Sequence, residues 1–92
     1  MEKVKDIQVF GKPYIIKHFN ARERAEIGEK AATIDEKTGK QKVSLALVRL
    51  WMVADGVVTP KMTLAEVEAM DGAIFDALFT AINDFNTAPL SP

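Results

Sequence analysis

The segment VSLALVRLWMVADG, residues Val43–Gly56, decides how the rest of the chain is organised. Apolar residues recur in it at helical spacing on two faces, and before Asp55 only Ser44 and Arg49 interrupt them. A helix that is apolar nearly all round is typical of a core helix, because each face needs cover from a neighbour. We therefore expect a helix over residues 42–55 at the buried centre of the fold, ending at Gly56. The two faces carry Val43, Leu47, Leu50, Trp51 and Ala54, and Leu45, Val48 and Met52.

Towards the N-terminus, the segment IQVFGKPYIIKHF predicts a β-hairpin over residues 6–19. A tip at Gly11-Lys12 places apolar residues opposite one another on one face. Pro13 cannot donate the hydrogen bond that closes a two-residue loop, so we expect a four-residue loop in the same register. A lone hairpin is marginally stable in water, so it must pack on the helices. The expected pairs are Val9 with Tyr14, Ile7 with Ile16 and Asp6 with Lys17.

Two segments separate the hairpin from the central helix. Asn20 followed by Glu23 is a loose capping box, which predicts a helix over residues 21–33. The apolar side of this helix is thin, so we expect it to lie on the surface. The stretch DEKTGKQK is polar and predicts a loop, in which Gly39 suits a positive φ angle.

Beyond the central helix, VVTPKM is a link that can be extended. Thr63 and Glu66 form a capping box that predicts a short helix over residues 64–70. An Asp-Gly pair breaks the pattern, and a wide apolar stripe then predicts a last helix over residues 73–85. Residues 87–92 contain two prolines and should form a flexible tail. The stripe carries Ile74, Phe75, Leu78, Phe79, Ile82 and Phe85.

These elements predict one small domain over residues 1–86 of the α+β class, mainly helical, with the N-terminal β-hairpin packed on a bundle of three to four helices. The absence of cysteine excludes disulfides and thiolate metal sites. No stretch approaches the roughly 20 apolar residues of a membrane span, and the N-terminus lacks the apolar stretch of a signal peptide. We expect a protein of the cytoplasm that contacts no membrane.

Charge is distributed unevenly along the chain. All twelve Lys and Arg residues lie at or before Lys61, together with eight acids, whereas residues 62–92 hold five acids and no base. The two C-terminal helices have the outline of a DNA-binding helix-turn-helix, but the second has no base to neutralise phosphates. We therefore expect no nucleic-acid binding by this unit. Opposite charges in the two parts of the chain favour contacts between copies, so we expect self-association.

The sequence contains no recognisable catalytic or metal-ligating set. His18 is the only histidine, and no HExxH motif, glycine-rich phosphate loop or nucleophile elbow is present. The pair Asp55-Gly56 lacks the spaced ligands of a calcium loop. We expect no enzymatic activity, no metal and no cofactor.

Large apolar residues are the remaining candidates for function. A small domain with an apolar central helix and a wide C-terminal stripe has apolar surface to spare, and exposed apolar patches bind partners or further copies. Each of these residues can instead belong to the core, and that alternative stays open here. The candidates for partner binding are Trp51, Met52, Phe75, Phe79, Ile82 and Phe85, with Phe79 and Phe85 as the expected anchors.

The order of the segments resembles the tail assembly chaperones of long-tailed bacteriophages and prophages. These small proteins have an N-terminal strand pair, a helix that starts with a sequence like AReR, an apolar helix that ends in DG, a short helix and a last helix like LFxAxxxLN. The resemblance covers nearly the whole chain in order. The matching segments are NARERAEI (Asn20–Ile27), LALVRLWMVADG (Leu45–Gly56), MTLAEVEAM (Met62–Met70) and ALFTAINDFN (Ala77–Asn86).

This resemblance implies a non-enzymatic function in the host cytoplasm. Such proteins bind the long, apolar, helical tape-measure protein, keep it soluble and help the tail-tube protein to polymerise around it. They are absent from the mature virion. Two other functions stay open for this sequence, a different small structural adaptor of phage or bacterial origin and a nucleic-acid-associated regulator that uses the basic N-terminal half.

Overall fold

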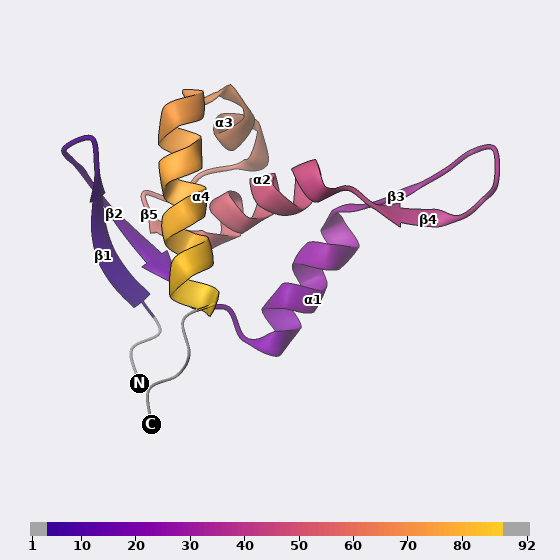
Figure 1. Cartoon of the computed structure of the whole chain (residues 1–92), viewed down its shortest axis with the longest axis horizontal. Coiled ribbons are helices and arrows are strands. Elements are labelled where there is room, and N and C mark those ends of the chain that lie inside the picture. Colours follow the sequence, from indigo (N-terminus) through magenta and orange to yellow (C-terminus); the bar gives the residue numbers. More distant parts are fainter. Residues whose placement is uncertain (1–3, 88–92) are drawn as a thin grey trace.

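Five strands and four helices form the part of the chain that the computed structural model describes, residues 4–87. They confirm the predicted class, α+β and mainly helical, with an N-terminal hairpin followed by four helices (Figure 1). The predicted tail over residues 87–92 lies outside the described residues, except for Thr87, which ends the last helix. In chain order the elements are β1 (Val4–Val9), β2 (Lys12–Lys17), α1 (Ala21–Lys30), β3 (Ala32–Ile34), β4 (Gln41–Val43), α2 (Leu45–Gly56), β5 (Val57–Thr59), α3 (Leu64–Ala69) and α4 (Gly72–Thr87).

The β1–β2 hairpin turns through two residues, Phe10 and Gly11, whose φ angles are 49° and 79°. Two positive φ angles in succession are the geometry that matches the twist of a two-residue hairpin. Glycine adopts it without steric cost, whereas a side chain such as that of Phe10 is uncommon there. The four-residue loop predicted from the sequence is therefore wrong.

The predicted register of the hairpin is also wrong, and each pair is shifted by two residues. Ile7 lies opposite Tyr14, not opposite Ile16. The prediction assumed that proline would have to close the turn, but Pro13 falls opposite Gln8, one pair beyond the closing pair. Successive pairs of an antiparallel ladder alternate between bonded and non-bonded, so the missing N–H of Pro13 removes no bond to β1.

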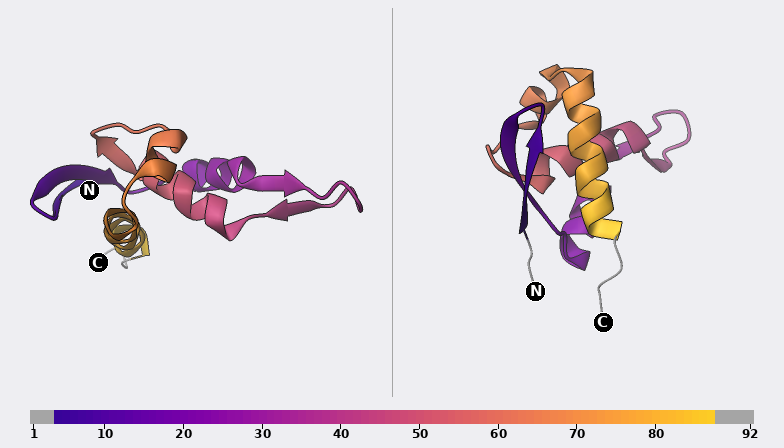
Figure 2. Two further views of the ribbon diagram at one scale, coloured as in Figure 1. Left: turned by 90° about the horizontal axis from the view of Figure 1, so that it is seen from above. Right: turned by 60° about the vertical axis from the view of Figure 1, so that its left-hand side comes forward.

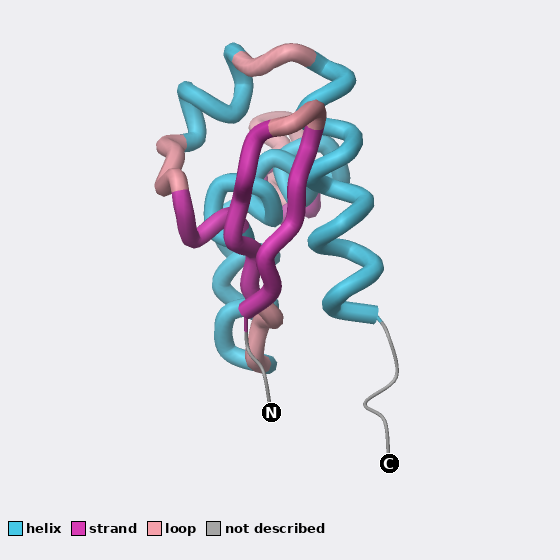
Figure 3. The backbone as a smooth tube through the Cα atoms, turned by 90° about the vertical axis from the view of Figure 1, so that its left-hand side faces the viewer, coloured by secondary structure: helices cyan, strands magenta, loops and turns pink. Residues whose placement is uncertain are grey.

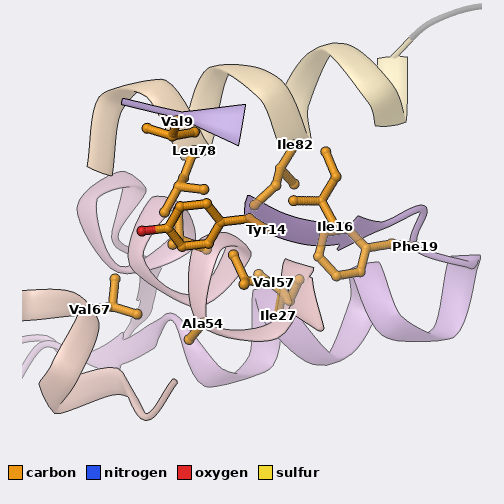
Figure 4. Close-up of a cluster of buried hydrophobic side chains, with 11 residues drawn as sticks. Val9, Tyr14, Ile16, Phe19, Ile27, Ala54, Val57, Val67, Leu78 and Ile82 are labelled. Carbon is orange, nitrogen blue, oxygen red and sulfur yellow. The ribbon is translucent and has the colours of Figure 1, made fainter. Parts of the chain in front are cut away.

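The third strand, β5, extends the hairpin into a sheet with the order β1-β2-β5, in which Ile16 lies opposite Val57. Helix α4 runs alongside the hairpin (Figure 3) and contacts both of its strands. Leu78 and Ile82 project from α4 into the main apolar cluster, where they meet Tyr14 and Ile16 from β2 (Figure 4). The core therefore lies between the sheet, α4 and the C-terminal half of α2.

A second, two-stranded sheet lies between α1 and α2, where we expected helix and loop. The helix predicted over residues 21–33 ends at Lys30, and β3 then pairs antiparallel with β4. We name residues 32–43 the β3–β4 ribbon; it projects from the body of the molecule (Figures 1 and 2). Gly39 adopts the expected positive φ, 68°, in its turn. Strands of three residues are too short for a two-residue periodicity to identify them.

Helix α2 is central, but only its C-terminal half is buried. It starts at Leu45, later than predicted, because the Ser44 side chain caps it by accepting a hydrogen bond from the Leu47 N–H at 3.3 Å. The helix contacts α1, α3, α4 and β5. Leu45 is nevertheless 74% exposed, so the expected burial on every face is wrong for the first turn, which leads out to the ribbon. The buried residues of α2 are Val53, Ala54 and Gly56.

Gly56 permits the close approach of α2 to α4. A Cβ atom at this position would lie 2.9 Å from Cδ1 of Ile82 and 3.2 Å from Cζ of Phe19. Ile82 and Phe19 are both buried in the core, at 0% and 3% exposure, so neither has free space to move into.

We expect Gly56→Ala to lower the free energy of unfolding by about 1–3 kcal/mol, because the added methyl group overpacks the core. Gly28→Ala is the matched control, since nothing lies within 4 Å of a Cβ atom at Gly28 in α1. The control should stabilise by roughly 0.5–1 kcal/mol through helix propensity. Urea unfolding of both variants checks this, and a Gly56→Ala protein as stable as Gly28→Ala would contradict the packing.

Both predicted capping boxes are present. At the start of α3, Glu66 donates its N–H to the Thr63 hydroxyl at 3.2 Å and accepts the Thr63 N–H on its carboxylate at 3.0 Å. Asn20 and Glu23 exchange the equivalent bonds at the start of α1. Hydrogen bonds from Thr63 to the Glu66 carboxylate favour its ionised form, and the bond from the Thr63 backbone N–H contributes more than the bond from the Thr63 side chain. They hold the pKa of Glu66 below its ordinary value of 4.5.

We expect Glu66 to titrate below pH 4.5 in carboxyl NMR spectra of the folded protein. A lowered folded-state pKa means that the stabilisation is present above the unfolded pKa and is lost as the pH falls through the folded pKa. Thr63→Ala removes the hydroxyl and should raise the midpoint. A wild-type midpoint at or above the ordinary value would show that the capping box does not form in solution.

Candidate partner-binding surface

The six candidate residues do not gather at one place. Ile82 is fully buried, so its predicted role in partner binding is wrong, and the domain uses it as core. Phe85 is half-buried at the base of the hairpin, where its ring meets His18 edge-on with 5.8 Å between the ring centres. Lys5 Nζ lies 5.9 Å from the centre of the same ring. Phe85 is thus separated from the other candidates by its position beside the sheet.

Trp51 faces α1 and helps to hold that helix in place. Lys30 Nζ lies 4.6 Å from the centre of the indole ring, which is a cation–π contact. The same ammonium group pairs with Asp55 at 2.9 Å, one turn further along α2. The half-buried indole is therefore part of the α1–α2 contact.

Phe75 and Phe79 stack on successive turns of α4, with 6.4 Å between the ring centres and 12° between the ring planes. Arg49 of α2 places its guanidinium carbon 5.5 Å from the centre of the Phe79 ring. Both aromatic residues are half-buried, so each packs at the boundary of α2 and α4 while keeping an edge exposed. This boundary combines apolar area with one cation.

Met52 lines a groove between α1, α2 and α4 with a volume of about 260 Å³. The groove joins the second apolar face of α2, represented by Val48 and Met52, to Ile27 of α1. Arg24 and Asn83 supply polar groups to its lining. The apolar face of α2 that we expected to be covered therefore lies open to this groove, which explains why the helix is apolar on two sides.

The groove continues the boundary at Phe79. Asn83 follows Phe79 by four residues and Met52 follows Arg49 by three, so each pair shares one side of its helix. Arg49 of α2 contacts Phe79 of α4. Met52 and Asn83, about one helical turn later on the same two helices, line the groove. We name this continuous area the α2–α4 surface, comprising Val48, Met52, Phe75, Phe79 and Asn83.

Asn86, which sequence reasoning missed, closes the groove at the C-terminal end of α4. Its side-chain oxygen accepts the buried Phe19 N–H at 2.7 Å, and its amide nitrogen donates to the carbonyls of Lys17 at 3.2 Å and Ile82 at 2.8 Å. Arg24 donates to the backbone carbonyl of Asn86 at 2.8 Å. Its position four residues after Ile82 puts this polar residue on the buried stripe, and that signal could have identified it.

A second hollow of about 330 Å³ lies on the other side of Phe19, which lines both. This hollow is polar and is bordered by ion pairs, one between Lys17 and Glu23 and one between Lys30 and Asp55. Within residues 4–87, no three His, Asp or Glu side chains are grouped so that they could hold a metal ion. The two ion pairs neutralise four of the charged side chains that line this hollow, which is more polar than the groove.

Comparisons with models of protein families, with curated proteins and with solved structures give no match for this chain. Among the helices of residues 4–87, none has the length and the apolar content that crossing a membrane requires. The candidate function therefore depends on the geometry of the α2–α4 surface and on the resemblance in the order of the sequence motifs.

Proposed function

We propose that this protein is a non-enzymatic tail assembly chaperone of a long-tailed phage or prophage. It binds the tape-measure protein, keeps that protein soluble in the cytoplasm and releases it as the tail-tube protein polymerises. The support is the ordered resemblance of four segments to this family, together with an open apolar groove at the segment that carries the apolar-helix motif.

The observation that carries the proposal is the groove between α1, α2 and α4. An amphipathic helix binds such a groove with apolar side chains spaced three or four residues apart. Val48, Met52 and Ile27 offer an apolar lining to those side chains, and the flexible thioether of Met52 adapts to partners of irregular sequence. Adaptability suits a partner that is long and that presents many different helical segments.

The stacked rings of Phe75 and Phe79 extend the apolar area along α4 beyond the groove. Large aromatic residues supply much of the binding free energy when they lie at the centre of an interface. Phe79 is therefore the anchor that we retain from the sequence prediction. Phe85 lies beside His18, away from the α2–α4 surface, and is tested as a separate site.

We expect the double variant Val48→Thr, Met52→Gln to lose solubilisation of the tape-measure protein encoded beside this chain. Both substitutions keep the side-chain volume close to the original while adding polar groups, so the fold should survive. Loss of two apolar contacts at the centre of an interface costs about 2 kcal/mol or more, which is roughly a 30-fold weaker affinity. The measurement is the soluble fraction of the co-expressed tape-measure protein and its co-purification with this chain.

Phe10→Asn is the matched control, because it removes a side chain that is 73% exposed on the hairpin turn, far from the groove. Asparagine tolerates the positive φ of that position, so the control should fold and solubilise like the wild type. Undiminished rescue by the folded double variant would remove the groove from the site. A wild-type protein that never rescues the tape-measure protein, or that retains nucleic acid in a salt-dependent way, would end the proposal.

A further inference from the structure

Two arginines lie along the α2–α4 surface, one at Phe79 and one at the C-terminal end of α4. Arg49 of α2 places its guanidinium carbon 5.5 Å from the centre of the Phe79 ring. Arg24 of α1 lines the groove and donates to the backbone carbonyl of Asn86 at 2.8 Å. Both arginines are exposed, so both guanidinium groups are accessible to a molecule bound between them.

Neither arginine is neutralised by a carboxylate of its own chain. Within residues 4–87, the ion pairs involve Lys17, Arg22 and Lys30, and neither of these two arginines. A guanidinium group has five N–H donors in a planar fork, and the contact with the Asn86 carbonyl uses one N–H group of Arg24. Both side chains therefore retain donors for the bidentate contact that arginine makes with a carboxylate.

The surface between the two arginines is positive, although the whole chain has a net charge of −1. Among the described residues that line the groove, Arg24 carries a charge and the others are apolar or neutral. Asp84 lies about 140° around α4 from Phe79 and is not in that lining. Asp76 lies on the same side of α4 as Phe79, but three residues before it, towards the start of the helix. A bound acidic group is therefore favoured from Phe79 onward and disfavoured beyond Asp76.

The spacing of the two arginines matches two turns of a helix that runs along α4. Asn86 follows Phe79 by seven residues, which places the two arginine contacts about 10 Å apart along the α4 axis. Positions i and i+7 of a bound helix have the same separation and lie on one side of it. Positions i+3 and i+4 lie between them on that side, where they would face the apolar groove.

We propose that the α2–α4 surface selects helices that carry acidic residues seven positions apart with apolar residues between them. One carboxylate binds Arg49 at the Phe79 end, and the other binds Arg24 at the Asn86 end. The apolar residues at i+3 and i+4 enter the groove beside Val48 and Met52. Charge complementarity of this kind discriminates against helices that are apolar alone. The inference rests on the proposed function, because it states which segments of the tape-measure protein this surface binds.

The test is the binding of synthetic helical peptides to the purified chain, measured by fluorescence anisotropy at low salt. The Glu peptide is alanine-rich, with Leu at i+3 and i+4 and Glu at i and i+7, and the Gln peptide has Gln in place of both Glu residues. The Glu peptide should bind about tenfold more tightly than the Gln peptide. Added salt should reduce this difference, because it screens exposed ion pairs.

Arg49→Gln should weaken binding of the Glu peptide about threefold and leave binding of the Gln peptide unchanged. Arg22→Gln is the matched control, because it makes the same change on α1 at a residue outside the groove lining, and it should bind like the wild type. Arg24→Gln should weaken binding as Arg49→Gln does. Arg24 also joins α1 to α4, so Arg24→Lys, which keeps the positive charge, should restore most of the affinity if the charge is what binds.

Charge reversal gives the decisive result. Two mixed peptides carry Lys at one of the positions i and i+7 and Glu at the other, and Arg49→Glu should bind one of them more tightly than it binds the Glu peptide. Equal affinity of the wild type for the Glu and Gln peptides would overturn the inference, and so would a Glu peptide that does not bind. The proposed function has a separate readout, because a groove that binds helices without regard to charge would still solubilise the co-expressed tape-measure protein.

Discussion

The hydrogen bonds of Asn86 join segments that are more than 60 residues apart, and the arrangement of the helices around the sheet depends on them. One side chain accepts from the Phe19 N–H and donates to the Lys17 carbonyl, while Arg24 donates to its backbone carbonyl. These bonds fix the end of α4 at the junction of β2 and α1. A buried backbone group without a partner costs about 1–3 kcal/mol, so no apolar residue could replace Asn86 there.

Local signals predicted the starts of α1 and α3 and the class of the fold, because capping depends on residues three apart. Thr63 and Glu66 are an example, since both sides of the box lie in one short segment. The hairpin was predicted but its register was not. The register follows from the two-residue turn, in which Phe10 adopts a positive φ angle that is uncommon for its residue type. The β3–β4 ribbon was missed because its strands are too short to show a periodic pattern. The Asn86 contacts were missed because their partners lie more than 60 residues away in the sequence.

The candidate site was predicted in part. The apolar residues on two faces of the central helix indicated more apolar surface than one core needs, but they did not show which face stays open. In the structure Val53 lies in the core, while Met52 lines the groove and Leu45 is exposed beside the ribbon. One helix thus contributes both to the core and to the proposed site for a helical partner. Ile82 shows that an apolar stripe alone does not separate core residues from binding residues, because Ile82 lies on the stripe of α4 and is fully buried.

Asn86 holds the end of α4 on the β2–α1 junction and lines the same end of the groove. Native-state hydrogen exchange of the Phe19 amide tests it most directly, since that N–H has the Asn86 side chain as its acceptor at 2.7 Å. We expect the Phe19 amide to exchange only on global unfolding, at the rate of core amides such as those of Leu78 and Val53. Exchange of Phe19 at the rate of an open loop, while the core amides stay protected, would contradict it.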